Sequence, residues 1–178
     1  MKPLPLLRPA EPRDVPAIVA LIVELAEFEQ LAHLVQATPE KLLPQLFGDK
    51  PAAECLVAEV AGDPATGQAG EIVAFALYFS NFSTFLAQPG LYLEDLYVRP
   101  PYRGSGLGRA LLRHLGRLAV ARGCGRFEWS VLDWNVDAIG FYQRMGATVM
   151  PDWRICRVSG AALQAFAGDD AEQPADRA

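Results

Sequence analysis

LYLEDLYVRPPYRGSGLGR, residues 91–109, contains a strand, a basic glycine-rich turn and the start of a helix. Its strand formers end at Pro100, where the missing N–H and the fixed φ of proline stop strand pairing. From Leu107 onward, apolar residues recur at helical spacing, which predicts a helix. The N–H groups at a helix start have no intrahelical partners, and glycine lets an anion approach them closely. Because Arg103 and Arg109 add positive charge, the turn is predicted to bind phosphate groups.

Two adjacent carboxylates, Glu94 and Asp95, lie inside the predicted strand. Strict alternation would send them to opposite faces of the sheet, so at least one of them must face inward or toward a cleft. Asp95 can be a functional group or a structural carboxylate paired with a cation, and the sequence leaves both interpretations open.

The composition fits one globular domain. The chain has 178 residues, of which 51% are hydrophobic, and this is enough for a single buried core. Residues 1–167 are expected to form the domain, and the small, acidic residues 168–178 a disordered tail. No apolar run approaches the roughly 20 residues that span a bilayer. The N-terminus also lacks a signal-peptide pattern, so we expect a cytoplasmic protein without a membrane partner.

Charge and cysteine usage narrow the classes of partner. The net charge of −5 and the pI near 5.0 argue against nucleic acid and are compatible with a small cationic substrate. The cysteines are odd in number and widely spaced, and no zinc pattern includes them. We therefore expect reduced thiols and no metal site.

The remaining chain alternates between strand and helix patterns. Helices are predicted after the caps Asp14, Thr38 and Asn135, at the turn described above, and over residues 161–167. Strands are predicted over residues 6–9, 54–60, 71–81, 91–99, 126–132, 148–150 and 153–158.

The glycine-rich turn differs from two nucleotide-binding loops. It lacks the Lys-Ser/Thr ending of a P-loop, and its glycine spacing does not fit Gly-x-Gly-x-x-Gly. Arg-x-x-Gly-x-Gly between a strand and an amphipathic helix instead resembles the acetyl-CoA pyrophosphate loop of the GCN5-related N-acetyltransferases, the GNAT superfamily.

A second motif lies beyond the loop. Asn135, Ala138, Phe141-Tyr142 and Gly146-Ala147 resemble the family's segment Asn-x-x-Ala-x-x-Phe-Tyr-x-x-x-Gly-Ala/Phe. LYLEDL, EWSVLDWN and the N-terminal LAEFE further resemble the diamine (spermidine/spermine) branch, which includes thialysine acetyltransferases. The likeness covers about residues 6–167.

The resemblance implies an α/β fold, with a mixed, mostly antiparallel twisted sheet of about seven strands that is flanked by helices and splays after the motif strand. It also implies a homodimer and acetyl-CoA as co-substrate. The residues expected to contact acetyl-CoA are Leu96, Tyr97, Val98, Arg103, Gly104, Ser105, Gly106, Leu107, Gly108, Arg109, Asn135 and Ala138.

The implied chemistry is transfer of an acetyl group to a primary amine. Such an amine has a pKa near 10.4, so it arrives protonated and must lose a proton before it attacks a thioester. Glu94 is expected to be the principal acid on the amine side, and the resemblance places Tyr142 where a phenol donates a proton to the leaving thiolate. The residues expected on the substrate side are Phe28, Glu29, Glu94, Asp95, Glu128, Trp129, Asp152 and Trp153.

Three functions are compatible with these patterns. The leading one is acetylation of a diamine, polyamine or thialysine-like amino acid in a ternary complex. A second has a protein, a peptide or an amino drug as acceptor. A third is a non-catalytic acyl-CoA sensor, against which the presence of both Glu94 and Tyr142 counts. Phe28 stands where related chains often have a tyrosine, so the acceptor does not follow from the resemblance.

Overall fold

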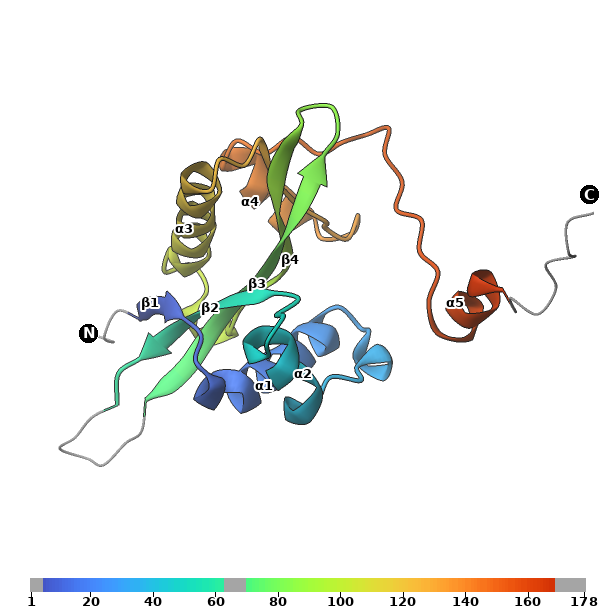
Figure 1. Cartoon of the computed structure of the whole chain (residues 1–178). Helices are drawn as coiled ribbons and strands as arrows, with labels where there is room; N and C mark the ends of the chain where they lie inside the picture. Colours follow the sequence, from blue (N-terminus) through green and yellow to red (C-terminus); the bar gives the residue numbers. More distant parts are fainter. Residues whose placement is uncertain (1–4, 63–69, 169–178) are drawn as a thin grey trace, which may run out of the picture. The chain divides into compact units, whose positions relative to one another are not determined.

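The computed structural model describes residues 5–62 and 70–168, and within it the chain forms two compact units (Figure 1). The first unit ends at Trp134 and the second begins at Asn135. The expectation of a single domain stays a prediction. The predicted tail from residue 169 onward, and residues 63–69 of the connection between the second and third strands, lie outside the described residues.

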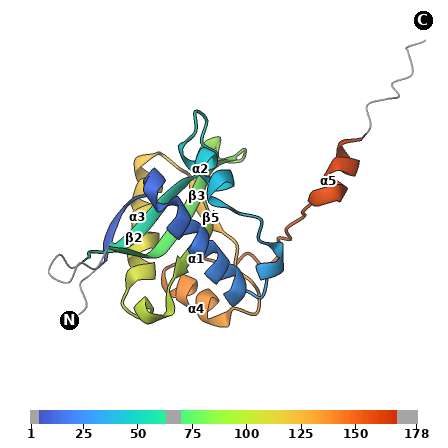
Figure 2. The ribbon, with the colours of Figure 1, turned by 90° about the horizontal axis from the view of Figure 1, so that it is seen from below.

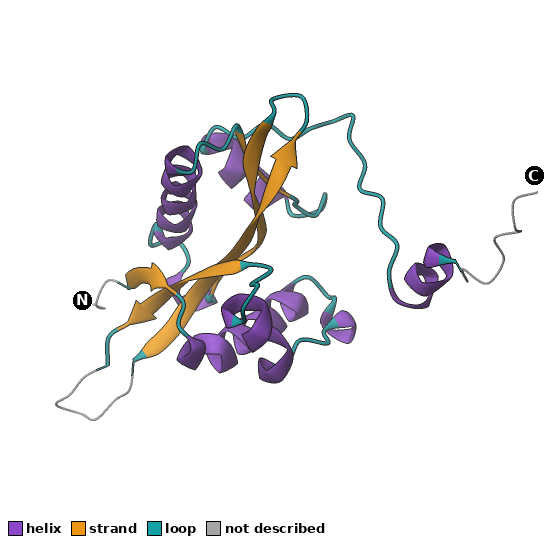
Figure 3. Cartoon of the chain, in the orientation of Figure 1, coloured by secondary structure: helices purple, strands orange, loops and turns teal. Residues whose placement is uncertain are grey.

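A five-stranded sheet in the order β1-β2-β3-β4-β5 forms the centre of the first unit (Figure 3). Neighbouring strands are antiparallel from β1 to β4, whereas β5 runs parallel to β4. The bounds are β1 Leu6–Pro9, β2 Glu54–Val60, β3 Glu71–Ser83, β4 Gln88–Val98 and β5 Arg126–Trp129.

Helices cover the two faces of this sheet. Figure 1 shows α3 on one face and α1 and α2 on the other, and Figure 2 shows the same unit from below. Ile18 and Leu21 of α1 pack with Phe75 of β3 in the core, and all three side chains are fully buried. The bounds are α1 Val15–Phe28, α2 Pro39–Phe47 and α3 Leu107–Ala121, with short 3-10 helices η1 Pro12–Asp14, η2 Ala32–Leu34 and η3 Pro100–Tyr102.

Strand β4 carries a β-bulge. Leu77 pairs with Asp95 and Tyr78 pairs with Leu93, so Glu94 is an extra residue in the ladder. Paired residues of an antiparallel ladder share a face, and neighbouring residues of β3 alternate between faces. Leu77 packs against the core beneath α1, so Asp95 points to the α1 face and Leu93 to the opposite face. Strict alternation, on which the sequence analysis relied, therefore fails at this point.

Strands β4 and β5 part just before the bulge. Strand β5 pairs only with residues 90–93 of β4, and the ladder stops at the pair of Leu93 and Trp129. A bulge bends its strand and increases the local twist, which is consistent with this divergence. The expected splay of the sheet is thus present, and it frees one edge of β4 beside the glycine-rich turn.

The expected strand number was too high. The predicted strand over residues 126–132 ends at Trp129, and the described residues of the second unit form no strand over 148–150 or 153–158. A strand needs a neighbour to satisfy its backbone N–H and C=O groups, and a local pattern cannot supply one. The second unit instead contains the helices α4 Val136–Arg144 and α5 Gly160–Ala167, neither of which has a buried residue.

Within the described residues, no helix is both long enough and apolar enough to span a membrane.

Candidate active site

The glycine-rich turn is an open backbone cradle at the start of α3. Gly104 and Gly106 have φ of +73° and +87°, in the left-handed region that favours glycine. A Cβ added to either residue would meet nothing within 4 Å, so the protein's own packing does not require the small side chain. Close approach of a ligand would require it. The cradle, the helix start and the exposed Arg109 therefore fit a pyrophosphate group.

Two hydrogen bonds hold the N-terminal part of the turn. Ser105 Oγ donates a hydrogen bond to the Tyr102 carbonyl oxygen at 2.6 Å. Arg103 Nε donates to the Val98 carbonyl oxygen at 2.9 Å, and its guanidinium lies over the ring of Tyr97 at 5.4 Å. The Arg103 side chain is thus engaged with β4.

The free edge of β4 leads into this turn. Leu96, Tyr97 and Val98 pair with residues 74–76 of β3, but β5 has already diverged from them. An extended ligand with amide groups, such as the pantetheine arm of CoA, can pair with such an edge in the way an added strand does. The geometry thus fits the expected cofactor contacts of these residues.

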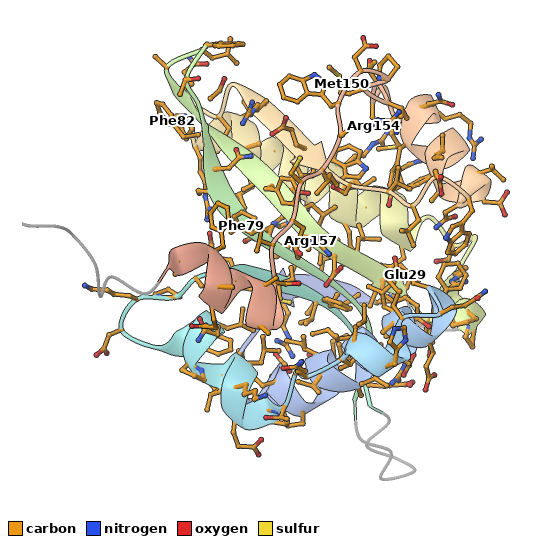
Figure 4. All side chains as sticks on the ribbon, turned by 90° about the vertical axis from the view of Figure 1, so that its right-hand side faces the viewer. Glu29, Phe79, Phe82, Met150, Arg154 and Arg157 are labelled. Atoms are coloured by element: carbon orange, nitrogen blue, oxygen red, sulfur yellow. The ribbon has the colours of Figure 1, made fainter. Side chains whose placement is uncertain are left out.

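Three carboxylates, those of Glu29, Glu94 and Asp95, lie close enough to influence one another. Burial, followed by the negative charges of Glu94 and Glu29, raises the pKa of Asp95 to about 6. Burial also raises the pKa of Glu29, which Figure 4 shows at the end of α1. Within residues 5–62 and 70–168, none of the three has a hydrogen bond or ion-pair partner. This cluster of unpaired negative charge is suited to hold a cation.

Phe28 lies beside the acid cluster. Its side chain is 42% exposed, and its ring contacts that of Trp134 with centroids 6.0 Å apart. The Arg103 guanidinium also lies over the Phe28 ring, 5.0 Å from its centroid. Trp134 was not singled out in the sequence analysis, because an aromatic residue in a loop has no periodic pattern to reveal its contact.

Glu128 is held differently from these acids. It accepts a hydrogen bond from Asn81 Nδ2 at 3.0 Å and forms an ion pair with Arg126 at 2.9 Å. Arg126 precedes it by two positions on β5, which places both side chains on one face of the strand. That spacing could have identified the pair from the sequence. Trp129 packs against Phe127, with ring centroids 4.9 Å apart.

The second unit contains the other predicted site residues. Asn135 caps α4 through its side-chain oxygen, which accepts from the Ala138 N–H at 3.2 Å. The rings of Phe141 and Tyr142 lie 5.4 Å apart on this helix. Asp152 and Trp153 are exposed in the segment that follows. The roles expected of these residues stay predictions.

Comparison with known proteins identifies the family. The model described as "Acetyltransferase (GNAT) family" matches residues 21–147. The chain is 38% identical to L-ornithine N5-acetyltransferase NATA1 of Arabidopsis thaliana, over 90% of this chain and 86% of that protein. It is also 38% identical to thialysine N-epsilon-acetyltransferase of Mus musculus, over 91% of this chain and 96% of that protein.

A solved structure shares the fold. An integron cassette protein from the mobile metagenome of V. cholerae matches with a TM-score of 0.73 and 22% identity, over 95% of this chain and 99% of that chain. The chain belongs to the GNAT family and is an N-acetyltransferase. The resemblance on which the sequence analysis relied is confirmed.

Proposed function

We propose that this enzyme transfers an acetyl group from acetyl-CoA to a primary amine of a small cationic acceptor, which is a diamine, a polyamine or an amino acid with a side-chain amine. The observation that carries the proposal is the cluster of Glu29, Glu94 and Asp95 beside an open phosphate cradle. The names of the relatives, which act on ornithine and thialysine, support it.

The acid cluster would bind the ammonium form of the acceptor. Asp95 is the most desolvated of the three acids, and an incoming cation offsets the cost of its burial. Glu94 is exposed and can pass a proton to water. In this division of roles Asp95 holds the cation, and Glu94 accepts the proton directly or through water.

The transfer step needs a base on one side and an acid on the other. The deprotonated amine nitrogen attacks the thioester carbonyl carbon, a C–N bond forms, and the C–S bond breaks. The departing thiolate takes a proton from the Tyr142 phenol, and the amide nitrogen loses its second proton through solvent, which restores the phenol. The first proton lost by the amine goes to the acid cluster and then to solvent.

Cofactor binding would use main-chain groups for the most part. The amides of residues 104–109 would hold the pyrophosphate, and the free edge of β4 at residues 96–98 would pair with the pantetheine arm. Asn135 and Ala138 of α4 are proposed as further contacts, in line with the second motif.

We further propose that the enzyme works as a cytoplasmic homodimer. The second unit exposes large apolar side chains that a second copy of the chain could cover, namely Met150, Trp153, Ile155, Leu163 and Phe166. The three cysteines are free thiols, as a reducing compartment requires. Light scattering coupled to size-exclusion chromatography would measure the mass, and a monomer at micromolar concentration would contradict the dimer.

The test of the function is thiol release from acetyl-CoA across a panel of amines. Ornithine, thialysine, lysine, diaminopropane and spermidine are compared, and mass spectrometry identifies the acetylated nitrogen. We expect turnover with at least one of them. Activity on peptides alone would favour a protein acceptor, whereas tight acetyl-CoA binding without any turnover would favour a sensor.

The Tyr142→Phe variant tests the proton donor in the same assay. We expect a lower kcat and an acetyl-CoA KM within about threefold of that of the wild-type enzyme, because the ring is kept and only the hydroxyl is lost. An unchanged kcat at every pH would exclude the donor role.

A further inference from the structure

Arg103 has a position that its sequence motif does not indicate. The motif places it at the start of the phosphate cradle, where an arginine is expected to face an anion. Its guanidinium instead lies between two aromatic rings, 5.0 Å from the Phe28 centroid and 5.4 Å from the Tyr97 centroid. Its Nε donates to the Val98 carbonyl oxygen at 2.9 Å, which fixes the plane of the group.

These contacts join segments that are distant in sequence. Tyr97 is buried on β4, whereas Phe28 is in the last turn of α1 and itself contacts Trp134, which follows β5. Arg103 is the residue of the cradle that reaches this row of aromatic side chains. We name the row Tyr97, Arg103, Phe28 and Trp134 the cation–aromatic stack.

The stack supports the end of helix α1. Phe28 is 42% exposed, so burial in the core does not fix its side chain. The helix ends directly after it, and Gln30 has a φ of +61°, a conformation that non-glycine residues rarely adopt. Glu29, one of the three acids, lies between these two residues. Its position therefore depends on how firmly Phe28 is held.

We propose that Arg103 is a positioning residue for the amine side, which couples the phosphate cradle to Glu29 through Phe28. This rests on the proposed function and adds a means by which the two substrates influence each other. A pyrophosphate bound to the cradle contacts residues 103–109 and adds to the hydrogen bonds that already hold Arg103. The guanidinium holds Phe28, and the acid beside Phe28 is then preorganised for the amine.

The coupling is reciprocal. If bound acetyl-CoA raises the affinity for the amine, bound amine raises the affinity for acetyl-CoA by the same factor. Loss of Arg103 is thus expected to weaken amine binding, although the residue belongs to the cofactor motif. Loss of Arg109, which shares the cradle but lies outside the stack, is expected to affect acetyl-CoA alone.

The experiment compares Arg103→Met with the matched control Arg109→Met in steady-state kinetics with ornithine and thialysine. At saturating acetyl-CoA, Arg103→Met should raise the amine KM by about two- to fivefold, the range expected for loss of an exposed cation–π contact. Arg109→Met should raise the acetyl-CoA KM and leave the amine KM within about twofold.

Phe28 variants provide the second arm. Phe28→Leu should raise the amine KM as Arg103→Met does, and the double variant should be no worse than either single variant, because both break one contact. Phe28→Tyr keeps the ring and should therefore raise the amine KM less than Phe28→Leu does. Arg103→Lys keeps the charge without the planar group and should recover only part of the loss.

Two results would overturn the proposal. One is an Arg103→Met variant whose acetyl-CoA KM alone changes, and the other is a double variant whose losses add. Calorimetric titration of thialysine, with and without CoA, gives a readout without turnover, and we expect CoA to tighten thialysine binding in the wild-type enzyme but not in Arg103→Met. A wild-type enzyme that neither binds nor acetylates these amines would refute the proposed function as well.

Discussion

Two aspartates in the first unit are both removed from solvent, but their pKa values shift in opposite directions. Asp14 is only 5% exposed, and it accepts hydrogen bonds from Arg8 at 2.6 and 2.9 Å and from the Glu11 N–H at 2.7 Å. The Arg8 guanidinium lowers its pKa despite the burial. Asp95 has no such partner within the described residues, and burial raises its pKa to about 6.

The difference separates a structural carboxylate, which is paired within the protein, from a poised carboxylate, which is buried without a partner and available to a cationic ligand. At Asp14 the protein itself provides the cation and the hydrogen bonds that offset desolvation. At Asp95 the cost remains in the folded protein, and a cationic ligand can offset it. Helix α1 repeats the contrast, because Glu24 pairs with Arg99 at 2.7 Å whereas Glu29 has no ion-pair partner among the described residues.

Removal of the structural carboxylate should have the largest effect on stability. Asp14→Ala leaves Arg8 with Glu59 as its remaining carboxylate partner, and we expect a loss of about 3 kcal/mol in the free energy of unfolding. Chemical denaturation measures it, with the exposed Asp49→Ala as control. The kcat/KM per folded molecule should stay within about twofold, and a large selective loss of activity would contradict the structural role.

Removal of the poised carboxylate should act on catalysis. We expect Asp95→Asn to lower kcat/KM for the amine about 100-fold at pH 7, because a neutral amide cannot attract the ammonium group. Acetyl-CoA affinity, measured by calorimetry, should change little. Wild-type kinetics in this variant would show that Asp95 is poised for no cationic ligand.

The same Asp95→Asn substitution should stabilise the protein. A raised pKa in the folded state means that ionised Asp95 destabilises the fold above about pH 6. The variant should gain about 1–2 kcal/mol at pH 7. This gain should shrink as the pH falls from about 6 to 3.8, where the wild-type side chain becomes protonated. Thermal unfolding across this range measures the effect, and a less stable variant at pH 7 would exclude an uncompensated charge.

The neighbouring acids should also shift the pH profile, an effect smaller than the losses above and separate from the fall in kcat that Glu94→Gln causes as the proposed proton acceptor. Glu94→Gln and Glu29→Gln each remove a negative charge that raises the pKa of Asp95, so the acidic limb of the pH profile of kcat/KM should move to lower pH. Glu94 is the stronger of the two influences, and its variant should show the larger shift. Equal shifts, or shifts to higher pH, would contradict the arrangement of the cluster.

Local patterns in the sequence predicted the cradle well. Glycine conformations, a helix start and a strand that ends at proline depend on neighbouring residues, so the strand end, the turn and the helix start lie where they were expected, although β4 begins at Gln88 and contains the bulge. The caps Thr38 and Asn135 also accept the hydrogen bonds that their position predicts. Asp14, predicted as a cap of α1, instead bonds Arg8 and the Glu11 N–H.

Features that depend on distant partners were not predictable in this way. The strands expected over residues 148–150 and 153–158 have no neighbour to pair with among the described residues. Likewise, the contact of Arg103 with Phe28 joins segments that no local spacing relates. The bulge at Glu94 needed the register of β3 to become visible.

That bulge has an evolutionary consequence. The ladder between β3 and β4 is complete on both sides of Glu94, so the strand contains one residue more than pairing requires. Deletion of this one codon would straighten β4 and leave every existing pair in place. An insertion or a deletion is therefore the genetic step by which a chain of this kind gains or loses the acid at position 94 while Asp95 keeps its pair with Leu77.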